Sequence, residues 1–262
     1  MNIFEESFDI IIQGGQSNAE GCGRGPVDEE LIPSQNCFYL QALKKVEVRE
    51  DNLHITFLDE PFQVVTAKET EDEIGKLGDF SLTFAKVYEH SGKLANGRKL
   101  MIIRAGVGGS GFKKGQWGIG NILHNKMIEL VDYALSLNKN NRVVAFLWHQ
   151  GEHDAFEKND PEIYREKLTA MIGDVRSRYG NMPFIAGDFV SEWKNKNVND
   201  CNPIIFAIKD VVKSVGKAKF VETADLPSNN QKTGNGDDIH FCRQSLHELG
   251  YRYFSAYSDI VK

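Results

Sequence analysis

The sequence predicts an α/β protein with a single doubly wound, mostly parallel sheet and helices on both faces. Strand-like and helix-like segments alternate along the chain, which is the pattern of such folds. Several strand-like segments are apolar nearly throughout, as strands are when helices cover both faces of a parallel sheet. The chain has 262 residues without an internal repeat or a linker, so we expect residues 1–262 to form a single domain.

The predicted strands are short apolar runs bounded by polar or glycine-containing segments. They cover residues 8–13, 53–58, 99–104, 142–148, 183–188 and 219–223. Residues 41–77 are charged and irregular, and we expect them to form an excursion with a small hairpin.

Helix-like segments fill most of the remaining chain. They cover residues 80–90, 121–137, 161–179, 203–215 and 243–260. The segment 161–179 has the clearest signals, because Asp160 can cap it, Pro161 suits the first helical position and apolar residues recur at helical spacing.

The composition is that of an ordinary soluble globular protein, with 41% hydrophobic and 26% charged residues. A net charge of −6 argues against nucleic acid or an anionic membrane as a partner. No apolar run approaches the roughly 20 residues of a membrane span. No signal peptide is visible, so we expect a cytoplasmic protein, although a removed export signal would also fit. Four cysteines without metal-site spacing are expected to be reduced thiols, and nothing indicates the oligomeric state.

Ser17 follows the first predicted strand through Gly14 and Gly15. Glycines let the backbone turn sharply off a strand, and open α/β sheets bind ligands beyond the strand ends. The nucleophile elbow G-x-S-x-G is absent, because Ala19 occupies the position of its second glycine. Taken alone, Ser17 is therefore either a nucleophile or a capping residue.

The loop 234–241 precedes the last predicted helix and contains Asp237 and His240. An aspartate three residues before a histidine can accept a hydrogen bond from the imidazole Nδ1–H, which leaves Nε2 free to take a proton from a serine. A solvated turn would also explain this common pattern. Together with the strand-end Ser17, the two residues are a candidate base and orienting acid.

A glycine-rich loop at 106–111 contains the dinucleotide-binding pattern G-x-G-x-x-G literally. The dinucleotide interpretation needs a helix that begins at once and an acidic residue about 20 residues further on, and the sequence offers neither. A loop that presents a backbone N–H to an oxyanion fits better.

His149, Glu152 and His153 form the inverted zinc-protease motif H-x-x-E-H. A zinc site requires a helix that brings both histidines to one face. Here the motif follows a predicted strand and Gly151 interrupts it, so a loop lining the crevice is the better interpretation.

In combination, these segments resemble the ordered blocks of the SGNH-hydrolase superfamily, and within it the carbohydrate-esterase branch of acetylxylan esterases and sialate O-acetylesterases. The matching blocks are residues 15–18, 108–110 with Trp117 downstream, 149–152 and 237–241. Their order and separations match, so the resemblance spans nearly the whole chain and implies a flavodoxin-like three-layer sandwich. Segment 78–86 also resembles this branch, with Asp79 in place of its usual proline.

The resemblance implies a role for each matching residue. Ser17 matches the nucleophile, His240 the general base and then acid, and Asp237 the residue that orients the histidine. The backbone N–H groups of Ser17 and Gly109 match the oxyanion donors, and Gln150 matches a further polar group of the oxyanion hole.

Further residues of these blocks are expected at the substrate or directly behind the catalytic groups. They are Gln16, Asn18, Glu152 and Trp117. The indole of Trp117 could stack on a sugar ring, and packing in the core or simple exposure at the surface would also explain it. His153 departs from the family pattern, which more often has a small polar residue there. Glu152 is a second carboxylate near the site, so it competes with Asp237 for the role of orienting acid.

The residues and the resemblance together predict a serine esterase that removes acetyl or another short acyl group from a carbohydrate hydroxyl. Neither a metal nor an organic cofactor is needed for this chemistry. Two other classes stay open: a zinc hydrolase that uses His149, Glu152 and His153, and a non-catalytic carbohydrate-binding module.

Overall fold

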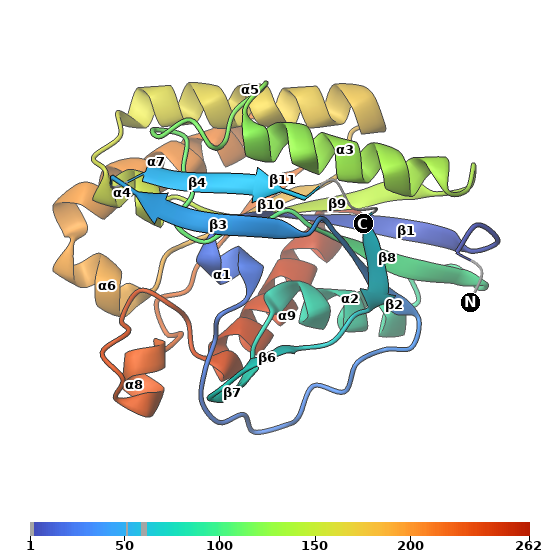
Figure 1. The fold of residues 1–262 in the computed structure, drawn as a ribbon, viewed down its shortest axis with the longest axis horizontal. Helices are drawn as coiled ribbons and strands as arrows, with labels where there is room; N and C mark the ends of the chain where they lie inside the picture. Colours follow the sequence, from blue (N-terminus) through green and yellow to red (C-terminus); the bar gives the residue numbers. More distant parts are fainter. Residues whose placement is uncertain (1–2, 51, 59–61) are drawn as a thin grey trace.

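The computed structural model describes residues 3–50, 52–58 and 62–262, and a seven-stranded sheet runs through its centre (Figure 1). Its strands, in order across the sheet, are β11 (Ala218–Val221), β10 (Phe184–Gly187), β9 (Arg142–His149), β1 (Ser7–Gly15), β8 (Arg98–Arg104), β2 (Cys37–Gln41) and β5 (Gln63–Thr66). Each pair of neighbours is parallel except β2 with β5. The mostly parallel sheet that the sequence predicts is therefore confirmed.

Helices cover both faces of this sheet (Figure 1). One layer contains α3 (Ile122–Ser136), α5 (Pro161–Tyr179) and α7 (Val198–Ser214), and the other contains α2 (Phe80–His90) and α9 (Arg243–Ile260). Alternate residues of β1 face the two layers. Ile10 and Ile12 belong to the hydrophobic core shared with α3, α5 and α7, and Ile11 belongs to the core shared with α2 and α9. This arrangement confirms the doubly wound α/β fold.

Most predicted elements lie close to the observed ones. The predicted helices 80–90, 161–179 and 243–260 have the bounds of α2, α5 and α9. Asp160 caps α5 by accepting a hydrogen bond from the Glu162 amide at 2.8 Å, and Asp79 caps α2 in the same way through the Ser81 amide at 2.9 Å.

Three differences have local causes. Helix α7 begins at Val198 instead of residue 203, so Pro203 lies inside the helix and does not open it. Strand β2 was not predicted, because its five residues contain no β-branched side chain. Strand β5 was not predicted either, because it lies within the charged excursion.

The excursion 41–77 forms more structure than the single small hairpin that we expected. Strands β3 (Lys44–Arg49) and β4 (Asn52–Phe57) form one hairpin, and β6 (Thr70–Asp72) and β7 (Gly75–Leu77) form another. The predicted strand 53–58 thus belongs to a hairpin outside the central sheet. Residues 51 and 59–61 of the excursion lie outside the described part of the chain.

Four short helices follow the carboxyl ends of four central strands, on the left in Figure 1. They are α1 (Ser17–Glu20) after β1, α4 (Glu152–Phe156) after β9, α6 (Ser191–Lys196) after β10 and α8 (Asn229–Thr233) after β11. Strands β8, β2 and β5 lie on one side of β1 and strands β9, β10 and β11 on the other, so the strand order reverses at β1. In such a fold a ligand binds beyond the carboxyl ends of the strands at this reversal.

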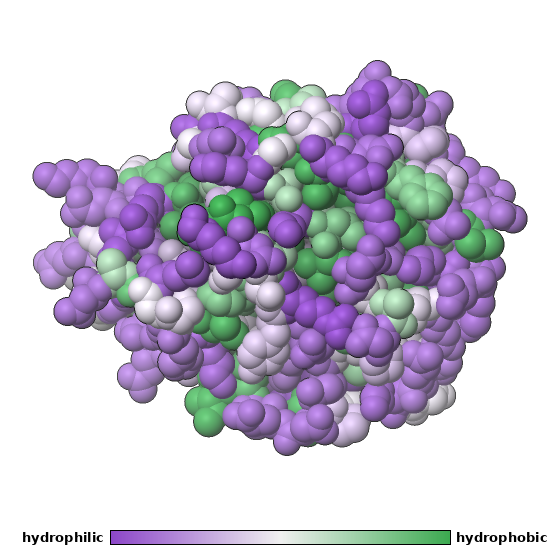
Figure 2. Space-filling view, turned by 180° about the vertical axis from the view of Figure 1, so that it is seen from behind, coloured by the Kyte–Doolittle hydropathy of each residue, from purple (hydrophilic) through white to green (hydrophobic). Residues whose placement is uncertain are grey.

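The surface is mainly polar. Figure 2 shows one face on which hydrophobic residues occur in small groups among hydrophilic ones. No helix within the described residues has the length and hydrophobicity needed to cross a membrane.

Candidate active site

The turn from β1 into α1 places Ser17 at the carboxyl edge of the sheet. Gly15 has φ of +133°, and a Cβ at this position would collide with the carbonyl group of His149 at the end of β9. The following amide, that of Gln16, donates a hydrogen bond to the same His149 carbonyl at 3.0 Å. A glycine is therefore required where the chain leaves the sheet, and Ser17 becomes the first residue of α1.

Ser17, His240 and Asp237 form one chain of hydrogen bonds. Ser17 Oγ lies 2.8 Å from His240 Nε2, and His240 Nδ1 lies 2.9 Å from Asp237 Oδ1. Because a carboxylate only accepts, the Nδ1 atom carries the proton, and Nε2 is free to accept the hydrogen bond of the Ser17 hydroxyl. The local D-x-x-H spacing and the distant serine thus meet in the geometry of a proton-transfer pair.

Helix α8 holds the aspartate in place. Asn229 Nδ2 donates to Asp237 Oδ2 at 2.7 Å, and the Asn229 amide donates to the His240 carbonyl at 2.8 Å. Burial opposes ionisation of Asp237, but the bonds from His240 and Asn229 hold the pKa of its carboxyl below the usual value. The residue is consequently a carboxylate at neutral pH.

Sequence reasoning missed Asn229, although its neighbourhood carried a signal. Ser228 and Gln231 form a capping box that starts α8. The spacing of a serine and a glutamine three residues apart predicts such a start. It does not predict that the next asparagine reaches Asp237.

The backbone amides of Ser17 and Gly109 are the candidate donors to an oxyanion. Gly108 lies against Ser17, and its own amide donates to Glu20 Oε2 at 2.8 Å. The next amide, that of Gly109, belongs to an exposed residue with φ of +70°. Within the part of the chain that the structure describes, the amides of Ser17 and Gly109 donate to no protein group, so both can serve an oxyanion.

Gln150 does not supply the oxyanion donor that we expected. Its Nε2 donates to Asp154 Oδ2 at 2.6 Å and to the Ser110 carbonyl at 3.2 Å, and its Oε1 accepts from the Tyr164 hydroxyl at 3.1 Å. Both ends of this buried amide are therefore occupied inside the protein, and Gln150 supports the surrounding loops.

Trp117 does not contact a substrate either. Its side chain is completely buried in the core between the sheet and the α3 layer, and its Nε1 donates to Ser110 Oγ at 2.9 Å. The indole has no exposed face on which a sugar ring could stack. The glycine-rich loop is the part of the site that Trp117 supports.

Gln16 and Asn18 flank the serine and point into the protein. Gln16 Oε1 accepts a hydrogen bond from the His153 amide at 3.1 Å, which ties α1 to α4. Asn18 Nδ2 donates to Glu152 Oε1 at 2.9 Å. Both side chains are thus directly behind the proposed catalytic groups.

The residues of the zinc motif do not share a helical face. His149 is the last residue of β9, and its Nδ1 lies 3.1 Å from the Tyr253 hydroxyl, whereas Glu152 and His153 begin α4. Among the described residues, no group of three or more histidine, cysteine and acidic side chains is arranged to hold a metal ion.

Asp154 is a structural carboxylate for which the sequence suggested no role. It is buried and accepts hydrogen bonds from the amides of Phe112 and Lys113, each at 2.9 Å, and from Asn159 Nδ2 at 2.7 Å. These bonds fix the end of the glycine-rich loop against α4. No sequence pattern identifies such a partner, because its donors come from two separate segments.

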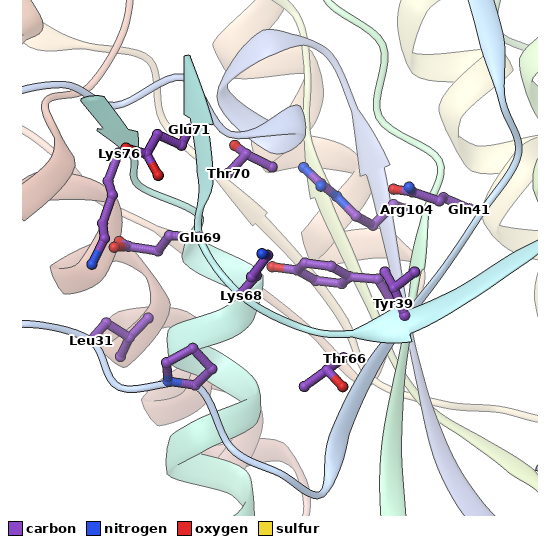
Figure 3. Close-up of a pocket in the computed structure, with 12 residues that line it drawn as sticks. Leu31, Tyr39, Gln41, Thr66, Lys68, Glu69, Thr70, Glu71, Lys76 and Arg104 are labelled. Atoms are coloured by element: carbon purple, nitrogen blue, oxygen red, sulfur yellow. The ribbon is translucent and has the colours of Figure 1, made fainter. Parts of the chain in front are cut away.

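A cavity of about 830 Å³ lies beside α1 (Figure 3). Most of its lining comes from β2, β5 and the β6–β7 hairpin, so the excursion builds it. Arg104 lines this cavity with its guanidinium 4.7 Å from the centre of the Tyr39 ring, and it also donates a hydrogen bond to the Glu20 carbonyl of α1. The excursion therefore creates a cavity whose lining includes Arg104, the residue that also contacts α1.

Comparison with known proteins identifies the family. The model of the family described as "Carbohydrate esterase, sialic acid-specific acetylesterase" matches residues 7–259. The chain belongs to this family of carbohydrate esterases, which makes it a carboxylic ester hydrolase that acts on acetylated carbohydrates. The predicted resemblance to the SGNH carbohydrate esterases is thereby confirmed. None of the curated proteins matches the chain by sequence.

Solved structures share the fold at low sequence identity. NanS superposes with a TM-score of 0.71 at 16% identity, over 98% of each chain. A carbohydrate acetylesterase from Xanthomonas citri gives 0.64 at 18% identity, over 96% of this chain and 56% of that one. Axe2, an acetylxylan esterase from Geobacillus stearothermophilus, gives 0.51 at 10% identity, over 100% of this chain and 96% of that one. At these identities the likeness shows the fold alone.

Proposed function

We propose that this esterase removes O-acetyl groups from carbohydrates through a covalent acyl-enzyme formed on Ser17. The observation that carries the proposal is the hydrogen-bonded chain from Asp237 through His240 to Ser17 Oγ. A serine hydroxyl is a weak nucleophile until an adjacent base accepts its proton, and His240 Nε2 is within reach of that proton.

In the first half of the reaction, Ser17 Oγ attacks the acetyl carbonyl carbon while His240 Nε2 takes the hydroxyl proton. The negative charge on the former carbonyl oxygen is stabilised by the amides of Ser17 and Gly109. The ester bond then breaks, and His240 gives its proton to the departing sugar oxygen. Asp237 stabilises the imidazolium while that proton is on His240.

In the second half, water takes the place of the sugar hydroxyl. His240 accepts a proton from the water as its oxygen attacks the acetyl-Ser17 carbonyl. The bond to Ser17 Oγ breaks, the proton on His240 returns to Ser17, and acetic acid leaves and ionises in water. The chain's own side chains and amides account for each proton and electron pair.

Asp237 is the acid that we assign to the histidine. Its carboxylate contacts His240 Nδ1, whereas the carboxylate of Glu152 contacts Asn18. This difference in contacts supports the assignment of the orienting role to Asp237.

The substitution Ser17→Ala tests the nucleophile. We expect kcat for p-nitrophenyl acetate and for O-acetylated sugars to fall on the order of 10⁶-fold, the loss that removal of the serine causes in a Ser-His-Asp triad on another fold. A fluorophosphonate should label the wild-type protein and leave Ser17→Ala unlabelled. Ser177→Ala, an exposed serine on α5, is the matched control and should retain wild-type turnover. Undiminished hydrolysis by Ser17→Ala would contradict the proposal.

A further inference from the structure

Four buried polar side chains form a connected row behind the proposed catalytic groups: Tyr253, His149, Glu152 and Asn18. None of them takes part in the proposed proton transfers. Burying so many polar groups is costly unless they are well paired. At one end of the row, Asn18 contacts the loop that carries His240.

Asn18 brackets His240 through the backbone. Its Oδ1 accepts a hydrogen bond from the Phe241 amide at 3.1 Å, and its Nδ2 donates to the Ile239 carbonyl at 3.2 Å. Ile239 and Phe241 are the two neighbours of His240 in the chain. The two bonds therefore fix the peptide groups on both sides of the histidine relative to α1, the helix that begins with Ser17.

Glu152 determines which way the Asn18 amide points. Its Oε1 accepts from Asn18 Nδ2 at 2.9 Å, and an ionised carboxylate can only accept. If the amide were flipped, its oxygen would face the carboxylate and its NH₂ group would face the Phe241 N–H, so both contacts would be repulsive. Burial opposes ionisation of Glu152, but His149 and Asn18 hold the pKa of its carboxyl below the usual value.

His149 and Tyr253 lie on the other side of the carboxylate. The Tyr253 hydroxyl donates to the Trp148 carbonyl at 2.8 Å, so its oxygen accepts from His149 Nδ1–H at 3.1 Å. Nε2 of this imidazole lies 3.5 Å from Glu152 Oε1 and has no hydrogen-bond partner within the described residues. The second oxygen of Glu152, Oε2, is buried and has no hydrogen-bond partner within the described residues. A carboxylate that is only partly satisfied is poorly explained by stability alone.

We propose that Glu152 is a positioning residue that acts through Asn18 to hold His240 within reach of Ser17. This inference rests on the proposed function, because it assigns Glu152 a role in that same reaction. The contact is made before substrate arrives and involves no group that the proposed mechanism places on the substrate, so the effect belongs to kcat and leaves substrate binding unchanged.

The substitution Glu152→Gln keeps the size of the side chain and removes its preference for the Asn18 NH₂ group. A small misplacement of a catalytic group costs up to about 10²-fold in rate, so we expect kcat to fall roughly 10–100-fold with KM changed less than about twofold. The Phe241 amide should exchange its hydrogen faster than in the wild type. Asp9→Asn, a buried carboxylate at the opposite end of β1, is the control and should retain kcat.

A double-mutant cycle with Asn18→Ala tests whether Glu152 acts through Asn18. If it does, Glu152→Gln should cost little further kcat once Asn18 is absent, because the two changes break the same link. Asn18→Ala also tests the link should Glu152→Gln fail to fold, since it keeps the carboxylate and should lower kcat while exposing the Phe241 amide to exchange.

Two results would overturn the inference: wild-type kcat in folded Glu152→Gln, or losses that multiply independently in the double mutant. Failure of the proposed function would appear differently. In that case Ser17→Ala would keep its turnover, while the faster exchange of the Phe241 amide in Glu152→Gln would still report that Glu152 positions the loop.

Discussion

At the scale of single residues, His240 depends on contacts with three different segments. Asp237 fixes its tautomer from within the same loop, and Asn229 of α8 fixes Asp237. Asn18 of α1 fixes the backbone on either side. Hydrogen bonds thus hold both the imidazole ring and the backbone of His240 before any substrate binds. Such preorganisation is the condition for proton transfer without rearrangement of the site.

Asp237→Asn should be the more damaging of the two acid substitutions. An asparagine in this position can present its NH₂ group to the imidazole and stabilise the wrong tautomer, which lowers kcat about 10⁴-fold in a Ser-His-Asp triad. The loss should therefore be at least tenfold larger than that of Glu152→Gln, measured as kcat for p-nitrophenyl acetate at pH 7 to 8. The opposite ranking would move the role of orienting acid to Glu152.

At the scale of elements, the site depends on how closely α9 approaches α2. Helix α9 begins three residues after His240, so its placement sets where the histidine loop ends. Gly250 lies where the two helices touch, and a Cβ there would overlap the Phe80 carbonyl oxygen and the Thr83 side chain. The contact is possible only because this helical position has no side chain.

Gly250→Ala should destabilise the fold by about 1–3 kcal/mol, because the helices must move apart to accommodate the methyl group. Gly173→Ala in α5 is the matched control. A Cβ at Gly173 would meet nothing within 4 Å beyond its own helix backbone, so this change should stabilise by roughly 0.5–1 kcal/mol through helix propensity. The midpoint of urea unfolding measures both changes. Equal shifts in the two variants would show that α2 and α9 are not in close contact.

At the scale of the whole molecule, the carboxyl and amino ends of the central strands have different roles. The carboxyl ends of the strands carry the site, and the amino ends carry an ion cluster around the buried carboxylate of Asp9. Arg98 of β8 and Arg142 of β9 each donate to Asp9 Oδ1 at 2.7 Å, and Tyr88 of α2 donates to its Oδ2 at 2.8 Å. One carboxylate therefore joins three strands and a helix far from Ser17.

This cluster should make the stability depend on pH in acid. Burial raises the pKa of Asp9, but the bonds from Arg142, Tyr88 and Arg98 outweigh it and leave the pKa below the usual value. A depressed carboxyl pKa means that the unfolded chain binds the proton more readily, so this contribution is complete above a pH of about 4 and is lost as the pH falls through the native pKa.

Asp9→Asn should consequently lower the free energy of unfolding by about 2 kcal/mol at pH 7, as expected for lost hydrogen bonds between charged groups. The difference from the wild type should shrink below a pH of about 4. Urea unfolding at pH 7, 5, 4 and 3 measures both. A difference that stays constant down to pH 3 would show that Asp9 is not ionised in the native protein.

The sequence by itself determined the layers of the fold and the local part of the site. The apolar strands and the helix 161–179 have strong short-range signals, because burial on both faces and capping are properties of neighbouring residues. The contact between Asp237 and His240 is equally local, since three residues are enough to bring the side chains together.

Only the tertiary structure decided which way the remaining polar groups point. Gln150 donates to Asp154 and not toward a substrate, Trp117 is enclosed in the core, and Asn18 joins Glu152 to the loop of His240. The excursion 41–77 also builds a cavity that its irregular sequence did not predict. The physical reason is that hydrogen bonds are directional and act between atoms that the folded chain brings together. The sequence placed residues 18, 152 and 240 near one site, but it did not indicate which atoms of their side chains would meet.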